Sequence, residues 1–314
     1  MLIIILRLMD RRWQWQTSRP AKPCQEGEAS ETNVSDTSPF CDWGGERIIV
    51  GSSMKARRIS SRIVEITPLG EGLARVDLEG PDLARGAACG CFAMVEVPGS
   101  GGCVLSRPYS LFLTVSDDRV ALLVKNMGRG SAELLASQPG DELAVLSPLG
   151  NEFPDPVGSC WAVAGGVGAA PFGYLAAREG VEIIFGAQDA GQSGFAGALE
   201  DVGATVELAT LDGSAGFKGT VVDCLLARLE NDRPDMIFSC GPTGMMEAVA
   251  AVARKHGIAC HVSLEARMGC GWGVCRGCVH RDASGGWRCI CEDGPVYAAA
   301  DIFAAAETVK GAGA

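Results

Sequence analysis

Four cysteines near the C-terminus have the spacing of an iron–sulfur site. Cys270, Cys275, Cys278 and Cys291 follow the pattern C-x4-C-x2-C-x12-C. Four thiolates gathered by tight turns can hold a metal centre, and the glycines between these cysteines permit such turns. The first two intervals are those of plant-type 2Fe–2S ligation, whereas structural zinc more often takes evenly spaced Cys pairs. The spacing therefore predicts a 2Fe–2S cluster ahead of zinc, and four unrelated buried cysteines last.

A fifth cysteine lies beside the last of these ligands. Cys289 precedes Cys291 by two residues, and we expect the two thiols to face opposite sides, so that only one points at the cluster. The turn-forming run E-D-G-P follows Cys291 directly and would fix its direction. We therefore predict Cys291, and not Cys289, as the fourth ligand.

Two loops, each between an apolar strand and a helix, indicate a nucleotide site. The first contributes Gly165, Gly166, Gly168 and Pro171, and the second contributes Cys240, Gly241 and Pro242. Glycine at such turns lets backbone N–H groups and a helix N-terminus approach a pyrophosphate. The first loop departs from G-x-G-x-x-G, glycine there often serves packing alone, and Cys240 could be a core thiol. A helix is expected from the first loop through Arg178.

A polar group on an earlier strand adds a possible phosphate and ring site. Its members are Arg107, Pro108, Tyr109 and Ser110, with Gly130 and Ser131 at the start of the nearest predicted helix. A guanidinium binds a phosphate through two parallel bonds, and a helix start offers a second seat for an anion. An ordinary strand followed by an ordinary helix cap is the competing interpretation, and it is favoured for the four strand residues taken alone.

Composition limits what these motifs can serve. The chain has 314 residues, 47% hydrophobic and 21% charged, which is enough for two or three packed domains. Its formal net charge of −11 leaves no cationic excess, so we expect no nucleic-acid partner. It has 14 cysteines but neither a leader pattern nor a membrane-length apolar run, which predicts a cytoplasmic protein without a membrane partner. Core packing is expected for Cys89, Cys91, Cys103, Cys160, Cys224 and Cys260.

The elements that must position these residues change character along the chain. Residues 1–53 are polar and without periodicity, which predicts a disordered tail of no function or a start assigned too far upstream. Short alternating strands over 54–155 predict an antiparallel β-barrel domain. Strands that alternate with helices over 156–264 predict an α/β domain with a parallel sheet. The dense Cys and Gly content of residues 265–314 predicts a small 2Fe–2S cluster-binding subdomain followed by a tail.

Taken in order, these motifs resemble the ferredoxin–NAD(P)+ reductase superfamily and, within it, the electron-transfer subunits of type B dihydroorotate dehydrogenase. The resemblance covers about residues 54–297. It is most specific in S-L-E-x-x-M-x-C-G-x-G-x-C-x-G-C, which begins at Ser263, and in C-x-D-G-P-V, which begins at Cys291. It implies FAD in the barrel domain, NAD in the α/β domain and a 2Fe–2S cluster on the cysteines.

The resemblance also implies which residues bind the cofactors. Those implied for FAD are Arg107, Pro108, Tyr109, Ser110, Leu123, Val124, Lys125, Gly130 and Ser131. Tyr109 would lie against the flavin ring and Ser110 near its reactive nitrogen, while Lys125 and Ser131 stand where the family often has Arg and Thr. The two glycine-containing loops would bind the nicotinamide nucleotide. NAD is preferred to NADP because residues 186–189 hold no cation, and Asp189 would repel a 2′-phosphate.

Electron counting and the resemblance together predict a reaction. Nicotinamide exchanges two electrons as hydride, a cluster passes one at a time, and a flavin does both, so the flavin must stand between them. No side-chain acid or base is required, and we predict no catalytic residue. The implied partner is an FMN-containing dihydroorotate dehydrogenase subunit in a heterotetramer of pyrimidine (UMP) biosynthesis. Nothing here resembles a (β/α)8 barrel, so the chain alone should not oxidise dihydroorotate.

Two alternatives remain open at this point. A sister subunit of the same superfamily would keep the flavin and cluster but serve a glutamate synthase, a sulfide dehydrogenase or a hydrogenase. A zinc-stapled module on a nucleotide-binding fold would be non-catalytic. The second alternative requires three cofactor-type motifs to have lost their function, which makes it the weaker of the two.

Overall fold

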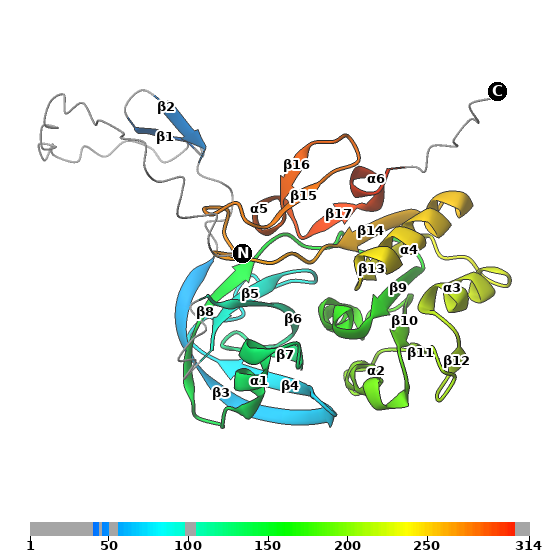
Figure 1. Cartoon of the computed structure of the whole chain (residues 1–314), viewed down its shortest axis with the longest axis horizontal. Helices are drawn as coiled ribbons and strands as arrows, with labels where there is room; N and C mark the ends of the chain where they lie inside the picture. Colours follow the sequence, from blue (N-terminus) through cyan, green and yellow to red (C-terminus); the bar gives the residue numbers. More distant parts are fainter. Residues whose placement is uncertain (1–39, 44–45, 50–55, 98–104, 305–314) are drawn as a thin grey trace, which may run out of the picture.

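The computed structural model describes residues 40–43, 46–49, 56–97 and 105–304. Figure 1 shows three parts: a barrel, a sheet with helices beside it, and a smaller C-terminal part that lies across both. No helix in these ranges is both long enough and apolar enough to cross a membrane. Within the predicted tail, β1 (Phe40–Trp43) and β2 (Glu46–Ile49) form a two-stranded antiparallel sheet, and the rest of that prediction lies outside the described residues.

Six antiparallel strands close into the predicted barrel. They are β3 (Arg57–Gly70), β4 (Leu73–Glu79), β5 (Phe92–Glu96), β6 (Arg107–Ser116), β7 (Arg119–Lys125) and β8 (Glu142–Leu149), and they follow the order β3-β4-β7-β6-β5-β8. Alternate residues of β3, such as Ile59 and Ile63, are buried, because successive side chains of a strand point to opposite faces. Helix α1 (Arg129–Ala136) follows β7 and covers one end of the barrel.

The second part is a seven-stranded sheet in the order β12-β11-β10-β9-β13-β14-β17. The strands are β9 (Cys160–Gly165), β10 (Val181–Ala187), β11 (Val206–Thr210), β12 (Phe217–Lys218), β13 (Met236–Cys240), β14 (Ala259–Ser263) and β17 (Val296–Ala298). All are parallel except β17, a short edge strand that the sequence did not reveal. The order of strands reverses between β9 and β13, and ligands of open α/β sheets bind at such a reversal.

The helices of this part are η2 (Gly166–Leu175), η3 (Ala190–Gln192), α2 (Gly194–Glu200), α3 (Val221–Leu229) and α4 (Thr243–His256). Thr220 and Asp223 form a capping box that begins α3. The segment after the first glycine loop differs from its prediction: it is a 3-10 helix and ends at Leu175, before Arg178. It contains Pro171, which lacks the N–H that a regular helix interior needs.

The C-terminal part packs onto both of the others. It comprises β15 (Val279–Arg281), β16 (Trp287–Cys289), α5 (Ile290–Asp293) and α6 (Ala299–Ile302), in addition to β17. One buried cluster joins Met94 of the barrel and Val262 of the sheet to Cys278 and Ile290. Because β17 completes the main sheet, the C-terminal part shares a sheet with the α/β part, and the predicted domain boundaries stay a prediction.

A glycine contact joins the barrel to the sheet. Gly173 in η2 lies so close to Phe112 in β6 that an added Cβ would overlap the carbonyl oxygen and the ring of Phe112. The ring of Phe112 is fully buried and belongs to the same core as Phe172. Only glycine therefore permits this distance between the two parts.

Replacing Gly173 by alanine should destabilise the chain by about 1–3 kcal/mol, the usual cost of overpacking a dense core. Gly197, inside α2, is the matched control, because nothing lies within 4 Å of its added Cβ. G197A should be neutral or should stabilise by up to ~1 kcal/mol through helix propensity. Urea unfolding at equal cofactor content measures both variants, and an equal loss in the two would contradict the packing account.

Candidate functional site

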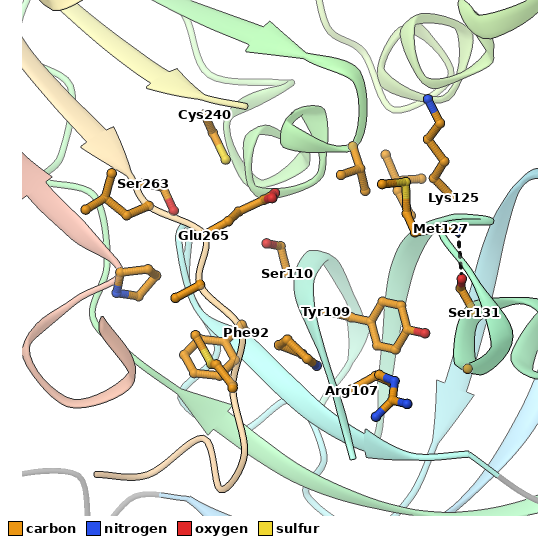
Figure 2. Close-up of a pocket in the computed structure, with 18 of the residues that line it drawn as sticks. Phe92, Arg107, Tyr109, Ser110, Lys125, Met127, Ser131, Cys240, Ser263 and Glu265 are labelled. Atoms are coloured by element: carbon orange, nitrogen blue, oxygen red, sulfur yellow. Dashed lines mark hydrogen bonds between the residues drawn. The ribbon is translucent and has the colours of Figure 1, made fainter. Parts of the chain in front are cut away.

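A cavity of about 460 Å³ lies between the barrel and the carboxyl edge of the sheet. Figure 2 shows its walls: β6, β7 and the start of α1 on one side, and the ends of β13 and β14 on the other. Many residues predicted to bind cofactors line it, namely Arg107, Pro108, Tyr109, Ser110, Leu123, Lys125, Gly130, Ser131 and Cys240. The structure thus unites the predicted flavin residues with one side of the predicted nucleotide crevice.

The start of α1 and Arg107 form one end of the cavity. A Cβ added to Gly130 would lie 2.7 Å from Arg107 Nε, so the bare backbone of α1 packs directly on the guanidinium. Ser131 Oγ accepts a hydrogen bond from Met127 N at 2.8 Å (Figure 2) and donates one to the Gly128 carbonyl at 3.0 Å. A cation beside a helix N-terminus can bind a phosphate.

Polar side chains meet at the opposite end. In Figure 2 the Ser110 hydroxyl points toward the Glu265 carboxyl, and Cys240 lies beyond them at the end of β13. The surrounding protein raises the pKa of Glu265 by removing water from around its carboxyl. Burial likewise raises the pKa of the Cys240 thiol. Both shifts favour the protonated forms of the two groups.

Several predicted residues do not line the cavity. Val124 faces the barrel core, because Leu123 and Lys125 on either side of it take the cavity face of β7. A Cβ on Gly168 would overlap the Cys240 carbonyl, and one on Gly165 would lie 3.0 Å from Pro242 Cδ.

The two nucleotide loops therefore touch each other, with their glycines at the contact. Gly241, like Gly165, lies at this contact, and Pro171 is buried within η2. Gly166 differs from these residues, because its φ is +56° and open space surrounds its added Cβ. A ligand could approach the backbone there, while the nucleotide-binding roles of the whole set stay a prediction.

Other lining residues were given no cofactor role by the sequence analysis, although some of them belong to its motifs: Phe92, Met127, Gly128, Arg129, Val167, Ser263, Leu264, Glu265, Ala266, Met268 and Pro295. Glu265 is the most informative of them. It belongs to the S-L-E-x-x-M pattern, which we interpreted only as leading into the cysteines. Its place just after a parallel strand was a usable signal, because ligands bind at that edge. Phe92 and Met127 had no such signal.

The cysteines gather beside this cavity. The sulfurs of Cys278, Cys289 and Cys291 all lie within 4.8 Å of one another. Cys270 and Cys275 form the first group along the chain, on the preceding loop, where Cys275 N donates to Cys270 Sγ at 3.4 Å, and Cys278, Cys289 and Cys291 form the second group. The four predicted ligands thus fall into two pairs, with Cys289 added to the second.

Backbone N–H groups point at the sulfurs of both groups. Gly277 N donates to Cys275 Sγ at 3.4 Å, Gly273 N to Cys291 Sγ at 3.1 Å, and Cys291 N to Cys278 Sγ at 3.4 Å. Such donors stabilise thiolates and tune iron–sulfur clusters. Soft thiolates with N–H donors around them fit a 2Fe–2S cluster on Cys270, Cys275, Cys278 and Cys291.

The expectation that Cys289 and Cys291 face opposite sides is wrong. Their sulfurs lie 3.8 Å apart, and Cys289 Sγ is 3.6 Å from Cys278 Sγ. Residues two apart in a strand share a face, so alternation never separated these two thiols. In addition, the chain leaves β16 at Cys289 and enters the helical turn of α5, which brings Cys291 back toward its neighbour.

Known proteins resemble this chain both in its cysteine region and over most of its length. Residues 265–303 match the model of the iron-sulfur cluster binding domain of dihydroorotate dehydrogenase B. The chain is 34% identical over 233 residues to the dihydroorotate dehydrogenase B (NAD(+)), electron transfer subunit, of Desulforamulus reducens, a match that covers 71% of this chain and 89% of the relative. Its counterpart in Bacillus caldolyticus is 35% identical over 272 residues, which cover 82% of this chain and 98% of the relative. The chain belongs to this family of electron transfer subunits.

The fold of this chain is also found in a solved oxidoreductase. A solved NADH-dependent reduced ferredoxin-NADP oxidoreductase, studied for flavin-based electron bifurcation, superposes with a TM-score of 0.69 at 26% identity. The match covers 77% of this chain and 89% of that one. The resemblance drawn from the sequence motifs is thereby confirmed.

In the metal-free subunit, Cys275 should be the most reactive of these thiols. It is exposed, and backbone N–H donation, first from Gly277, lowers its pKa to about 7. About half of it is then thiolate at pH 7, against a few per cent for an ordinary thiol. Burial raises the pKa of Cys291, which should react far more slowly.

Iodoacetamide labelling across pH, followed by peptide mass spectrometry, measures both rates. The Cys275 rate should reach half of its maximum near pH 7 and then level off. Labelling of Cys291 ahead of Cys275, or a Cys275 midpoint near pH 9, would contradict the assignment of the N–H bonds.

Proposed function

We propose that this chain passes electrons between an FMN-containing dihydroorotate dehydrogenase subunit and NAD+ through a 2Fe–2S cluster and FAD, in pyrimidine biosynthesis. One observation carries the proposal. The segment after β14 lines the cavity with Glu265 and Met268, and Cys270 follows Met268 by two residues. A flavin in the cavity and a cluster on the cysteines would therefore be neighbours, as one-electron transfer between them requires.

The residues that line the cavity suit FAD in their chemistry. FAD, when bound, would exchange hydride with a nicotinamide and single electrons with the cluster. Arg107 and the N-terminus of α1 would bind its phosphates, while Tyr109 and Leu123 offer apolar surface for its rings. Lys125 donates to Gln192 Oε1 at 2.9 Å, which holds the barrel wall to the nucleotide side.

Glu265 and Ser110 would orient the ring system. Because desolvation raises the pKa of Glu265, its carboxyl stays protonated to a higher pH than an exposed glutamate and can donate a hydrogen bond. Ser110 offers a second hydroxyl from the facing strand. Hydride transfer needs no proton from either side chain, so we assign them positioning and not acid–base catalysis.

The nicotinamide nucleotide would enter beside Gly166. Asp189, which follows β10 by two residues, accepts a hydrogen bond from Gln192 N at 3.1 Å, which fixes the orientation of its carboxylate. The segment 186–189 supplies no cation. A 2′-phosphate would meet negative charge there, which favours NAD over NADP.

The partner subunit would dock over the cysteine loop. Large apolar side chains are exposed around it, including Trp272 (54%), Val274 (68%), Val279 (44%) and Trp287 (69%). Exposed apolar side chains gathered beside a redox centre fit an interface with a second chain.

We also propose a cytoplasmic location, because the cysteines in the described ranges form no disulfide, as expected of a reducing compartment.

The test is an anaerobic titration of the purified chain with NADH. Flavin and cluster absorbance should both bleach. Addition of an FMN-containing dihydroorotate dehydrogenase should then permit NAD+ reduction by dihydroorotate, which the isolated chain should not catalyse. A colourless zinc protein, or turnover of dihydroorotate without a partner, would overturn the proposal. Bleaching by NADH but no transfer with that partner would favour a sister enzyme.

Arg107→Ala should weaken FAD binding about 10- to 100-fold, because a charge-assisted hydrogen bond contributes roughly 1.5–3 kcal/mol. Arg85, on the barrel surface beside Asp82, is the matched control for loss of an exposed guanidinium. R85A should bind FAD as the unmodified chain does. Fluorescence titration of the FAD-free protein measures the affinities, and equal affinity in R107A and the unmodified chain would remove Arg107 from the site.

A further inference from the structure

The second cysteine group holds one more thiol than the cluster uses. Cys278, Cys289 and Cys291 are each no more than 3% exposed, and their sulfurs form a compact triangle. Two sulfurs bound to one tetrahedral metal at about 2.3 Å lie roughly 3.8 Å apart. Cys289 Sγ is 3.6 Å from Cys278 Sγ and 3.8 Å from Cys291 Sγ. The distance from the Cys289 sulfur to each neighbouring sulfur is therefore the one expected between two ligands of the same metal ion.

The backbone holds Cys289 in this position. Its N–H donates to Asp293 Oδ2 at 2.6 Å, and it pairs with Val279 across the β15–β16 hairpin. The next residue, Ile290, donates its N–H to the Cys278 carbonyl at 3.0 Å. The Cys289 sulfur can change position only by side-chain rotation, which keeps it near the cluster site.

Hydrogen bonding decides which thiol is the resident ligand. Cys291 Sγ accepts the Gly273 N–H at 3.1 Å, and Cys278 Sγ accepts the Cys291 N–H at 3.4 Å. Among the residues that the structure places, Cys289 Sγ contacts these two sulfurs and receives no backbone N–H bond. Since N–H donors stabilise bound thiolates, Cys291 is favoured while it is present.

We propose that Cys289 is a reserve ligand of the cluster, which binds iron when Cys291 does not. In the exchange, the bond from iron to Cys291 sulfur breaks, the bond to Cys289 sulfur forms, and the Cys289 thiol proton passes to the Cys291 thiolate. Where Cys291 is absent, that proton goes to water during cluster assembly. No oxidation state changes. The inference rests on the cluster assigned under the proposed function.

Four variants test the reserve ligand: C289S, C291S, C289S/C291S and, as the control for a buried cysteine elsewhere, C224S. Iron and acid-labile sulfide per chain should be unchanged in C289S and C224S. C291S should keep at least about half of the unmodified iron content, whereas C289S/C291S should fall below about a tenth, because ligand loss is loss of metal affinity. C291S and C289S/C291S both carry the serine at position 291, so any binding of iron by its hydroxyl is common to these two variants.

Electron paramagnetic resonance of the reduced chains supplies a second readout. C291S should give a 2Fe–2S signal with shifted g values, and C289S should give the unmodified signal. Equal iron loss in C291S and C289S/C291S would overturn the proposal. Loss of iron in C289S with an unchanged signal in C291S would also overturn it, since Cys289 would then be the resident ligand.

Two controls distinguish absence of the reserve role from absence of the cluster and from misfolding of a variant. An unmodified chain without iron would contradict the cluster assignment itself. Iron in the unmodified chain but not in C291S would contradict only the reserve role of Cys289. Far-UV circular dichroism and FAD content identify a variant that does not fold. In that event, C291A and C289A/C291A repeat the comparison with a side chain that cannot bind iron.

Discussion

The segment from Ser263 to Cys278 is the constraint on which the rest of the site depends, because it must reach the sheet, the barrel and the cysteines within sixteen residues. It leaves the sheet at the end of β14, lines the cavity, and then turns over the barrel. An added Cβ at Gly271, whose φ is +82°, would overlap Met94 of β5, so the loop rests directly on the barrel wall. The buried cluster around Met94, Val262 and Cys278 makes this crossing rigid.

Two opposite electrostatic effects operate at the ends of this segment. Near the cavity, removal of water raises the pKa of Glu265 and favours its protonated form. On the cysteine loop, exposed backbone N–H groups lower the pKa of Cys275 and favour its thiolate. The burial of Glu265 and the exposure of Cys275 thus favour the neutral form of one group and the ionised form of the other within a single segment.

Glycines serve different purposes in what the sequence shows as one kind of motif. Those at Gly165 and Gly168 allow the loops after β9 and β13 to touch, and Gly173 allows the barrel to touch the sheet. Gly166 alone of this run combines a positive φ with open space. The two loops therefore pack closely at the strand reversal, and most of the glycines in this run are required by packing.

The sequence by itself determined the classes of structure and chemistry. Strand periodicity predicted the barrel, alternation of strands and helices predicted the parallel sheet, and the spacing of Cys270, Cys275 and Cys278 predicted the metal centre, because each is a local pattern. Only the tertiary structure decided which side chains meet. It placed Glu265 in the cavity, turned Val124 into the barrel, added the edge strand β17, and brought Cys289 to the sulfurs of Cys278 and Cys291. These contacts join residues distant in the chain or depend on where a strand gives way to a helical turn, and no local pattern records either.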